Sequence, residues 1–508
     1  MRIEFDSGAA RARRWRVDLA ERLAACGHEV AVARSAPARM AAETGLALLV
    51  GLERLLYGIA HPLCSESIDW PAGFAGSGAA SDLVVDFGGK RLETPAEATT
   101  LIPLYDGRPG EEAAIGAVLD GHAPWLSIAL RRPGDSEARL VAAALPALEE
   151  PLIFSLSIER VLRRMVSLLS RTIERFAAGR LDEQGPSLPV SPVPPRPGVW
   201  PASAFLVRGV SAKLARRLTS LCAHTHHWRI GWRWAKGDEV FTRRASPASP
   251  YAVLRDDARR FYADPFVLWR DGVAHVLCEE FPYATGKGVI SAFSIRPDGA
   301  VSAPRVVLER PYHLSYPMVF ARYGQIYMIP ETSANRTVEL YRATIFPDQW
   351  TLEATLLEGL SAADATLTER DGRLWLFAAL AEDGGSSWDT LGLFHAERLT
   401  GPWSAHAANP VLIDAGSARP GGMLFEHGGS LIRPAQDCTA GYGSGLSLFR
   451  VDRLDPEGYL QVPLARLAPP PNCGAKGMHT LNAAGGLEVI DWLGLRPRRP
   501  APNASGRP

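Results

Sequence analysis

A repeated strand–turn–strand unit in the second half of this chain restricts its fold more than any other feature. Five segments share one plan: a strand, a turn that contains glycine, and a second strand of alternating apolar residues. The turn glycines recur at intervals of 52, 48, 56 and 57 residues, at Gly272, Gly324, Gly372, Gly428 and Gly485. Five units of this size predict a five-bladed β-propeller, because propeller blades are four-stranded sheets of about this length. A β-sandwich is the alternative, but it does not explain the near-equal spacing.

The segments on either side of the repeat predict the domain boundaries. HWRIGWRW (His227–Trp234) precedes the first unit, and we expect it to supply a strand that closes the last blade. We therefore predict a propeller over 225–495 and a helical connector over 202–224. The proline-rich run over 183–201 predicts a semi-stiff linker. The Pro- and Arg-rich residues 496–508 predict a disordered tail.

The first half of the chain alternates strand-like and helix-like segments. MRIEF and Ser81–Phe87 have the pattern of strands, whereas Trp15–Cys26 and Ile158–Phe176 have helical periodicity. Such alternation predicts an α/β domain with a mostly parallel, Rossmann-like sheet over 1–182. A two-domain chain also fits the length of 508 residues.

The composition excludes several classes of protein. The 55 basic and 55 acidic residues balance, which argues against a nucleic-acid partner. No two of the six cysteines have the C-x-x-C spacing, so we expect buried thiols that do not bind a metal. We also expect no cofactor. The sequence shows neither the apolar core of a secretory signal nor a transmembrane segment. We expect a cytoplasmic protein, and association with a membrane surface is the alternative.

Polar residues occupy matched positions of the repeat, where the strands of a blade meet one rim of the propeller. At or near the eighth position before the turn glycine stand Asp264, Tyr316, Asp364, Arg419 and His479. At the seventh or eighth position after it stand Glu279, Glu280, Glu331 and Gln436. Convergent polar groups in a concave site are the first candidates for an active site.

We therefore predict one site at the propeller axis. Asp264, Asp364, Glu331 and Glu280 are its predicted catalytic residues. Arg419, His479, Tyr316 and Gln436 are its predicted substrate-binding residues. Each of them also has a plain structural explanation, since an Asp before Pro is a common turn-former and a buried histidine can be a satisfied core residue.

The motifs YADPF, CEEF, SYPMV, PET, DAT and RPGG lie between Trp228 and Trp492. This region resembles the N-terminal propeller region of plant glucosamine inositolphosphorylceramide transferases and, more distantly, the five-bladed furanosidase clan of arabinanases, invertases and levansucrases. In that clan the carboxylate that opens blade one is the base or nucleophile, and the carboxylate of blade three orients the substrate. The resemblance implies these roles for Asp264 and Asp364. Arg419 stands where the clan has its general acid.

The replacement of that acid by arginine favours transfer over hydrolysis. A glycosidase protonates its leaving group and needs a carboxylic acid with a raised pKa. A glycosyltransferase expels a phosphate, which gains from a cation. We predict a glycosyltransferase of glycolipid or envelope polysaccharide synthesis that takes a sugar or nucleotide sugar and a lipid or polysaccharide acceptor. A furanosidase-type hydrolase, with Glu331 or Glu280 as the acid, and a non-catalytic glycan-binding protein are the alternatives.

The segment TLIPLYDGRPG, which follows the strand SDLVVDF, resembles formyltransferases that act on methionyl-tRNA or amino sugars. Their motif is Asn-x-His-Pro-Ser-Leu-Leu-Pro-x-Tyr-Arg-Gly. Aligning Leu101–Gly107 with its end places Ala96 at the catalytic Asn, Ala98 at the catalytic His and Asp106 at the Arg. A methyl group neither polarises a carbonyl nor carries a proton. The resemblance thus implies a formyltransferase-like domain without formyl transfer, used for binding or docking or kept as a packed relic.

Overall fold

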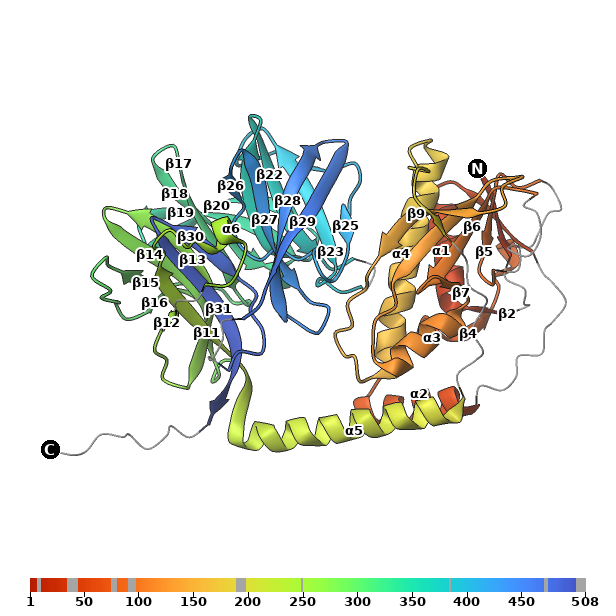
Figure 1. Cartoon of the computed structure of the whole chain (residues 1–508), viewed down its shortest axis with the longest axis horizontal. Coiled ribbons are helices and arrows are strands. Elements are labelled where there is room, and N and C mark those ends of the chain that lie inside the picture. The colour runs from red at the N-terminus through yellow and green to blue at the C-terminus, as the bar shows by residue number, and fades with distance from the viewer. Residues whose placement is uncertain are drawn as a thin grey trace. The chain divides into compact units, whose positions relative to one another are not determined.

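The structure is a computed structural model. It describes residues 1–6, 11–33, 44–74, 80–89, 97–188, 198–247, 250–382, 385–469 and 474–498. The chain forms two compact units, one made mainly of residues 1–214 and the other of residues from 215 onward. Figure 1 shows the first as a sheet with helices and the second as a ring of small sheets.

One mixed sheet forms the centre of the first unit. Its order is β10 (Ser187–Leu188), β9 (Ala138–Ala144), β8 (Leu126–Arg131), β6 (Thr100–Tyr105), β5 (Leu83–Asp86), β1 (Arg2–Asp6) and β3 (Glu29–Ala33), with the short β7 (Arg108–Pro109) beside β6. β3, β1, β5 and β6 run parallel, whereas β8, β9 and β10 add to them antiparallel. The predicted mostly parallel sheet is thus only half parallel. The connection from β8 to β9 is a short turn, and such a turn can join only antiparallel strands.

The helices α1 (Arg14–Ala25), α3 (Glu111–Asp120) and α4 (Phe154–Ala177) pack on this sheet, and α2 (Thr44–Tyr57) packs on α4. The short elements are β2 (Arg11–Arg13), β4 (Ser67–Asp69) and η1 (Ala72–Phe74). α4 buries Ile158, Leu162, Met165 and Leu169 at helical spacing and packs against α1, α2 and α3. Figure 1 shows α4 lying along the sheet. This apolar stripe is why the 24-residue helix is stable in this position.

α5 (Val199–Cys222) is followed directly by the first propeller strand, β11 (Ala223–Trp234). The helix predicted over 202–224 therefore begins three residues earlier, and Pro201 lies in its first turn, where a missing N–H costs nothing. Within the predicted linker over 183–201, Ser187–Leu188 pair with the sheet, and residues 189–197 lie outside the described part of the chain. Among the described residues, no helix is both long and apolar enough to cross a bilayer.

Among the described residues, four four-stranded sheets and one five-stranded sheet form the second unit and confirm the predicted five-bladed propeller. The first is β13 (Arg260–Arg270), β14 (Val273–Pro282), β15 (Val289–Ile295) and β16 (Arg305–Leu308); the second is β17 (Ser315–Arg322), β18 (Gln325–Thr332), β19 (Thr337–Ile345) and β20 (Gln349–Glu358). The third is β21 (Ala362–Arg370), β22 (Arg373–Leu380), β23 (Thr390–Ala396) and β24 (Ser404–Ala405), with β25 (Leu412–Ile413) beside β23. The fourth is β26 (Phe425–His427), β27 (Ser430–Asp437), β28 (Gly445–Asp455) and β29 (Gly458–Leu467). The fifth contains β30 (Leu481–Ala484), β31 (Leu487–Pro497), β11 and β12 (Ala252–Val253). Two short helices lie between strands of the second unit, α6 (Val240–Arg243) and η3 (Ser333–Asn335).

The last blade is closed by the first strand of the unit, as predicted. β11 pairs antiparallel with β31, and Trp228 lies opposite Leu493. This pairing joins strands from the two ends of the repeat, so the ring has no open seam and no free inner edge.

The hairpin turns explain the glycines that reveal the repeat. In the first blade Asp271 and Gly272 both have positive φ, at 50° and 76°, and the second and third blades repeat this conformation. A two-residue hairpin of this type requires positive φ at both positions, which glycine adopts without a steric cost.

Candidate active site

Three blades place a residue with left-handed backbone conformation at the same point of their first strand. Asp264, Tyr316 and Asp364 have φ of 50°, 44° and 54°. Each lies at a shift of register between the first two strands of its blade, that is, at a β-bulge. A bulge redirects side chains, and a non-glycine residue in this conformation costs about 1–3 kcal/mol. Three blades therefore have a strained backbone at the same position of their first strand, and the bulge turns the polar side chains at these positions towards one region.

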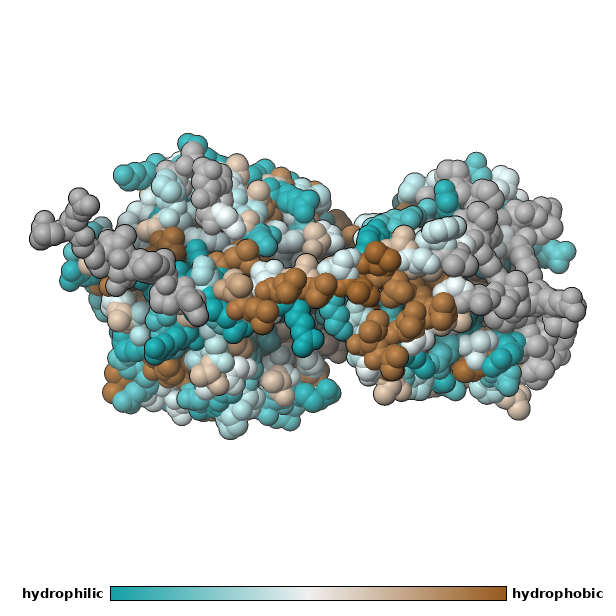
Figure 2. All heavy atoms as spheres, turned by 90° about the horizontal axis from the view of Figure 1, so that it is seen from below, coloured by the Kyte–Doolittle hydropathy of each residue, from teal (hydrophilic) through white to brown (hydrophobic). Residues whose placement is uncertain are grey.

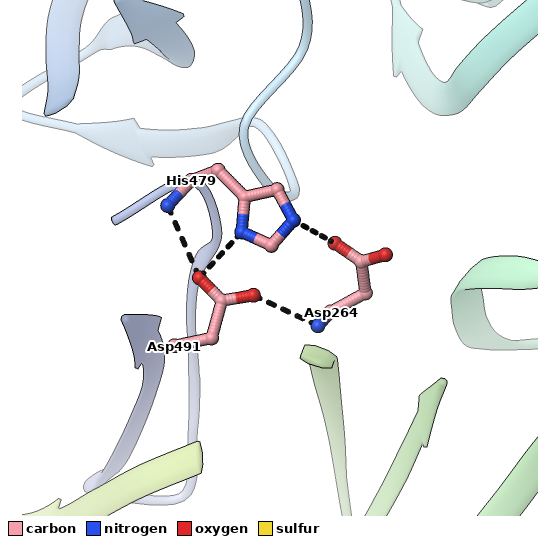
Figure 3. Close-up of side chains that lie close together, drawn as sticks. All are labelled: Asp264, His479 and Asp491. Atoms are coloured by element: carbon pink, nitrogen blue, oxygen red, sulfur yellow. Dashed lines mark hydrogen bonds and ion pairs between the residues drawn. The ribbon is translucent and has the colours of Figure 1, made fainter. Parts of the chain in front are cut away.

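The histidine group comprises Asp264, His479 and Asp491. Figure 3 shows the His479 ring between the two carboxylates. Nε2 lies 3.3 Å from Oδ1 of Asp264, and Nδ1 lies 2.7 Å from Oδ1 of Asp491. All three residues are buried. Thr480 Oγ1 donates a hydrogen bond of 2.8 Å to Asp264 Oδ1 and completes the surroundings of that carboxylate.

Asp491 holds this group together. Its carboxylate accepts hydrogen bonds from the backbone N–H groups of Asp264, His479 and Thr480, at 2.8, 3.1 and 2.9 Å. Burial lowers the pKa of His479, but the two carboxylates outweigh burial and raise that pKa above its ordinary value. Burial likewise raises the pKa of Asp264, and His479 opposes the rise. The ring is therefore held as a cation between two acids.

The same three residues could be considered as metal ligands, because one ligand atom from each lies within 4.8 Å of the others. The arrangement fits a direct ion pair better. The carboxylates face different ring nitrogens, and the contact of 2.7 Å to Asp491 is shorter than the separation of about 3.3 Å between two ligands of a tetrahedral zinc ion. The imidazolium itself fills the position between the acids.

The arginine group comprises Asp364, Arg419, Glu331 and Gln436. Arg419 Nε donates to Asp364 Oδ2 at 2.6 Å, and Gln436 Nε2 donates to the same oxygen at 2.7 Å. Arg419 Nη2 lies 3.8 Å from Glu331 Oε2, while Glu331 accepts a hydrogen bond of 3.3 Å from the backbone N–H of Asp364. Burial raises the pKa of Asp364, and the Arg419 guanidinium opposes that rise. A permanent cation thus lies between two acids.

Tyr316 connects the blades. Its backbone N–H donates to Asp264 Oδ2 at 3.3 Å, and its hydroxyl lies 3.0 Å from Thr366 Oγ1 and accepts a hydrogen bond of 2.8 Å from the backbone N–H of Gly422. The residue is fully buried, and its ring packs on Phe266. Tyr316 therefore lies in the cluster as predicted, but its hydroxyl is already engaged with protein groups.

The structure corrects one predicted site residue, Glu280. Its carboxylate pairs with Arg260 and accepts a hydrogen bond of 2.6 Å from Ser291, and it belongs to neither group. The neighbouring Glu279 faces the cluster instead, because successive side chains of a strand point to opposite faces. Burial, followed by repulsion from Asp264 and Glu331, raises the pKa of Glu279 well above its ordinary value. Burial and its acidic neighbours therefore favour the protonated form of Glu279.

The register shows why Glu279 and Glu331 are equivalent. Glu279 lies opposite Ala263 in blade one, and Glu331 lies opposite Ser315 in blade two. Both stand seven positions after their turn glycine. The sequence contains the distinction between the two glutamates, because Glu279 is at the seventh position after the turn glycine and Glu280 is at the eighth.

Aromatic side chains lie against both groups. The rings of Trp228 and His479 stack with centroids 3.9 Å apart. Tyr442 packs on Trp228, Trp388 and His479, and Arg419 lies over its ring at 5.0 Å. Sugar rings present C–H faces that pack on aromatic rings, so these residues suit a carbohydrate ligand. Matched positions of the repeat do not point to Tyr442, Trp228, Trp388 or Asp491. For Asp491 the available signal in the sequence is a carboxylate between Ile490 and Trp492 in a buried strand.

Comparison with known proteins shows which family the propeller resembles. Residues 248–483 match the family model described as glucosamine inositolphosphorylceramide transferase 1, N-terminal. This confirms that the propeller resembles the N-terminal region of these transferases.

Particular relatives show how far the match extends. A relative from Oryza sativa subsp. japonica, glucosamine inositolphosphorylceramide transferase 1, is 36% identical over 208 residues, which cover 40% of this chain and 28% of that protein. The protein of the same name from Arabidopsis thaliana is 32% identical over 206 residues, with 40% and 27% covered. The chain therefore matches less than a third of the length of these curated relatives.

Similar solved structures include two glycoside hydrolases. The catalytic domain of Coprinopsis cinerea GH62 α-L-arabinofuranosidase is 14% identical with a TM-score of 0.37, and the match covers 55% of this chain and 93% of that one. An exo-1,5-α-L-arabinanase from a bovine ruminal metagenomic library is 15% identical with a TM-score of 0.33, covering 48% and 95%.

Proposed function

We propose that the propeller is a carbohydrate-active enzyme that transfers a glycosyl group in glycolipid or envelope polysaccharide synthesis. One observation carries the proposal: Arg419, from blade four, is buried beside Asp364 and Glu331 at the place where a hydrolase of this fold would have its general acid. A fixed cation stabilises a departing phosphate without donating a proton. The donor is therefore a sugar joined to phosphate, such as a nucleotide sugar.

The proposed reaction assigns a role to each group. Asp264 accepts the proton of the acceptor hydroxyl, and the hydroxyl oxygen forms a bond to the anomeric carbon. The bond from that carbon to the donor phosphate breaks, and the phosphate leaves with the electron pair towards Arg419. A carboxylate whose pKa is raised by burial, as for Asp264, is a stronger base than an exposed one. His479 and Asp491 position this base.

The relatives suggest which substrates to test first. Their name gives glucosamine as the sugar and inositolphosphorylceramide as the acceptor. The chain matches 28% of the rice protein, so the use of these substrates here is part of the proposal. A nucleotide-activated glucosamine or N-acetylglucosamine and an inositol phospholipid are the corresponding probes.

Hydrolysis is the second candidate, and Glu279 favours it. A carboxyl group whose pKa is raised well above its ordinary value remains protonated and can act as a general acid. Such an acid would replace the one missing at Arg419. Under this alternative the substrate is a furanoside, and Asp264 is the base or nucleophile.

The purified full chain distinguishes these functions. Release of nucleoside diphosphate that depends on an inositol phospholipid, together with a labelled lipid product, supports transfer. Release of nitrophenol from nitrophenyl furanosides supports hydrolysis instead, and loss in Glu279→Gln of hydrolysis of furanosides with an unactivated alcohol leaving group would identify Glu279 as the acid. Asp264→Asn should reduce either reaction by at least about 100-fold, because it removes the base. Glycan binding without turnover, unchanged in Asp264→Asn, would overturn both and leave a binding protein.

For the first unit, we propose a formyltransferase-like domain that has lost formyl transfer. The segment that carries the resemblance forms β6, at the point where the parallel strands of the sheet end and the antiparallel ones begin. Ala98 precedes this strand, and Ala96 lies outside the described residues. Formylation of an amino sugar or methionyl-tRNA by the full chain with a formyl-folate donor would contradict this proposal.

A further inference from the structure

Helix α5 carries a stripe of exposed apolar side chains along one side. Its members recur at helical spacing and are Trp200, Val207, Val210, Leu214, Leu218 and Leu221. Trp200 is 86% exposed and Leu221 is 71% exposed. With 3.6 residues per turn these positions fall on one face. An exposed stripe of this length on a long helix marks a contact surface.

The other side of α5 is fixed to the first unit. Ala202 and Phe205 are buried, and the Phe205 ring packs edge-on against Phe154. At Gly209 an added Cβ would lie 2.7 Å from the carbonyl oxygen of Leu152, so the helix backbone lies directly on that segment. Up to Gly209 the apolar stripe is thus the outer side of a docked helix and does not serve to attach α5, whereas residues 213–219 are exposed on every side of the helix.

Helix α2 extends this surface. Leu48, Leu55 and Leu56 are exposed on it. Lys213 of α5 donates a hydrogen bond of 3.1 Å to the carbonyl oxygen of Leu56, and its Nζ lies 3.9 Å from the centre of the Tyr57 ring. Figure 2 shows the apolar side chains of the two helices on one face. We call the exposed apolar residues of α2 and α5 the apolar face.

Charges on the two helices have one sign. α5 contains no Asp or Glu, and its basic residues are Arg208, Lys213, Arg216 and Arg217. The acidic residue of α2 is Glu53, which is buried and accepts hydrogen bonds from the backbone N–H groups of Phe154 and Ser155. Lys213 and Arg217 therefore lie beside the apolar stripe, whereas Arg216 lies on the opposite side of α5, and neither helix has an exposed carboxylate.

We propose that the apolar face docks the protein on the surface of an anionic lipid bilayer. A helix with an apolar side and basic residues beside it lies in the interface of such a membrane, and each basic residue near anionic headgroups adds to binding. Trp200 at the start of α5 suits the headgroup region. A second copy of the chain is a poor occupant, because a symmetric contact would bring the same basic residues together without an acid between them. The inference does not depend on the reaction at the propeller.

Vesicle co-sedimentation of the full chain tests this surface. We expect binding to vesicles of phosphatidylcholine with about 30 mol% phosphatidylserine, and much weaker binding to phosphatidylcholine alone. The double variant L214E/L218E should lower the partition coefficient by about tenfold or more, and R217E should lower it by less and only on anionic vesicles. Glutamate is a good helix former, so α5 should persist.

The matched control is L352E/L460E, which places the same charges on exposed leucines of the propeller and should bind like wild type. Circular dichroism of each variant verifies folding. Absence of wild-type binding to anionic vesicles, or equal binding by L214E/L218E, would overturn the proposal. So would equal binding to neutral and anionic vesicles. A concentration-dependent dimer that L214E/L218E abolishes, without vesicle binding, would show that a second copy covers the apolar face.

Discussion

The histidine group and the arginine group hold buried carboxylates by different means. Each takes an acid from a strained strand position, Asp264 or Asp364, and a cation from one of the last two blades. The cation of one group is an imidazolium whose pKa the two carboxylates raise, and the cation of the other is a guanidinium that stays charged. The cation of the histidine group can therefore lose its charge as the pH rises, whereas the cation of the arginine group cannot. The predictions below test this difference.

Removal of the permanent cation should have the largest effect. Arg419→Ala leaves Asp364 and Glu331 buried without compensation, and we expect a loss of about 3–5 kcal/mol in the free energy of unfolding. Urea denaturation measures this loss, which should become smaller in more acidic solution, where Asp364 takes up a proton. The control Arg305→Ala breaks a half-exposed pair with Asp348 and should cost under about 1 kcal/mol. Equal losses in the two variants would contradict the role of Arg419.

Removal of the titratable cation should have a smaller, pH-dependent effect. The pKa of His479 is raised by folding, so its stabilising contribution is complete below the ordinary value of 6.5 and is lost as the pH rises through the raised pKa. We expect His479→Gln to cost about 2–3 kcal/mol at about pH 6 and progressively less in more alkaline solution. Denaturation series across this range measure the change. A penalty that does not vary with pH would show that the ring is neutral.

Neutralisation of Glu279 should stabilise the protein. The folded pKa of this carboxyl lies well above the ordinary 4.5, so wild-type stability falls as the pH rises above 4.5, while the Gln variant lacks this loss. We expect Glu279→Gln to be more stable than wild type at neutral pH, with a difference that first grows as the pH rises above 4.5. Thermal unfolding at several pH values measures the difference. A destabilised variant at neutral pH would mean that Glu279 is ionised and paired.

The neighbouring substitution Glu280→Gln should have the smallest effect. Its partner Arg260 is partly exposed, and glutamine can still accept the hydrogen bond from Ser291. We expect a cost under about 1 kcal/mol and unchanged turnover. Activity assays of the Glu279 and Glu280 variants side by side provide the measurement. Loss of turnover in Glu280→Gln alone would reverse the assignment made from the strand register.

The propeller was predictable because its turns need particular residues. Gly272, Gly324 and Gly372 occur where positive φ is required, and their spacing gives the size of the blade. The sheet of the first unit was harder to predict. Alternating strands and helices indicate an α/β domain, but they do not specify that β8 joins β6 antiparallel, which depends on the path of the chain between them.

The cluster was predictable where it follows the repeat. Asp264, Tyr316 and Asp364 share one offset, and the structure brings them together with Arg419, His479, Glu331 and Gln436. Asp491 comes from a strand position that holds no acidic residue in the other blades, so a comparison of matched positions could not reveal it. The distinction between Glu279 and Glu280 depends on a single step of register, which determines the face of the strand.

Closure of the ring by β11 has a consequence for the order in which the chain folds during synthesis. Arg229 of this strand donates a hydrogen bond to the carbonyl of Leu495, 266 residues further along the chain. While the ribosome produces the blades in between, β11 can pair with the short β12, but the edge that pairs with β31 in the finished blade has no partner. The strand contains three tryptophans and lies directly after α5. A nascent chain thus carries a half-paired, aromatic-rich strand through most of propeller synthesis, and this strand edge is a candidate for chaperone protection.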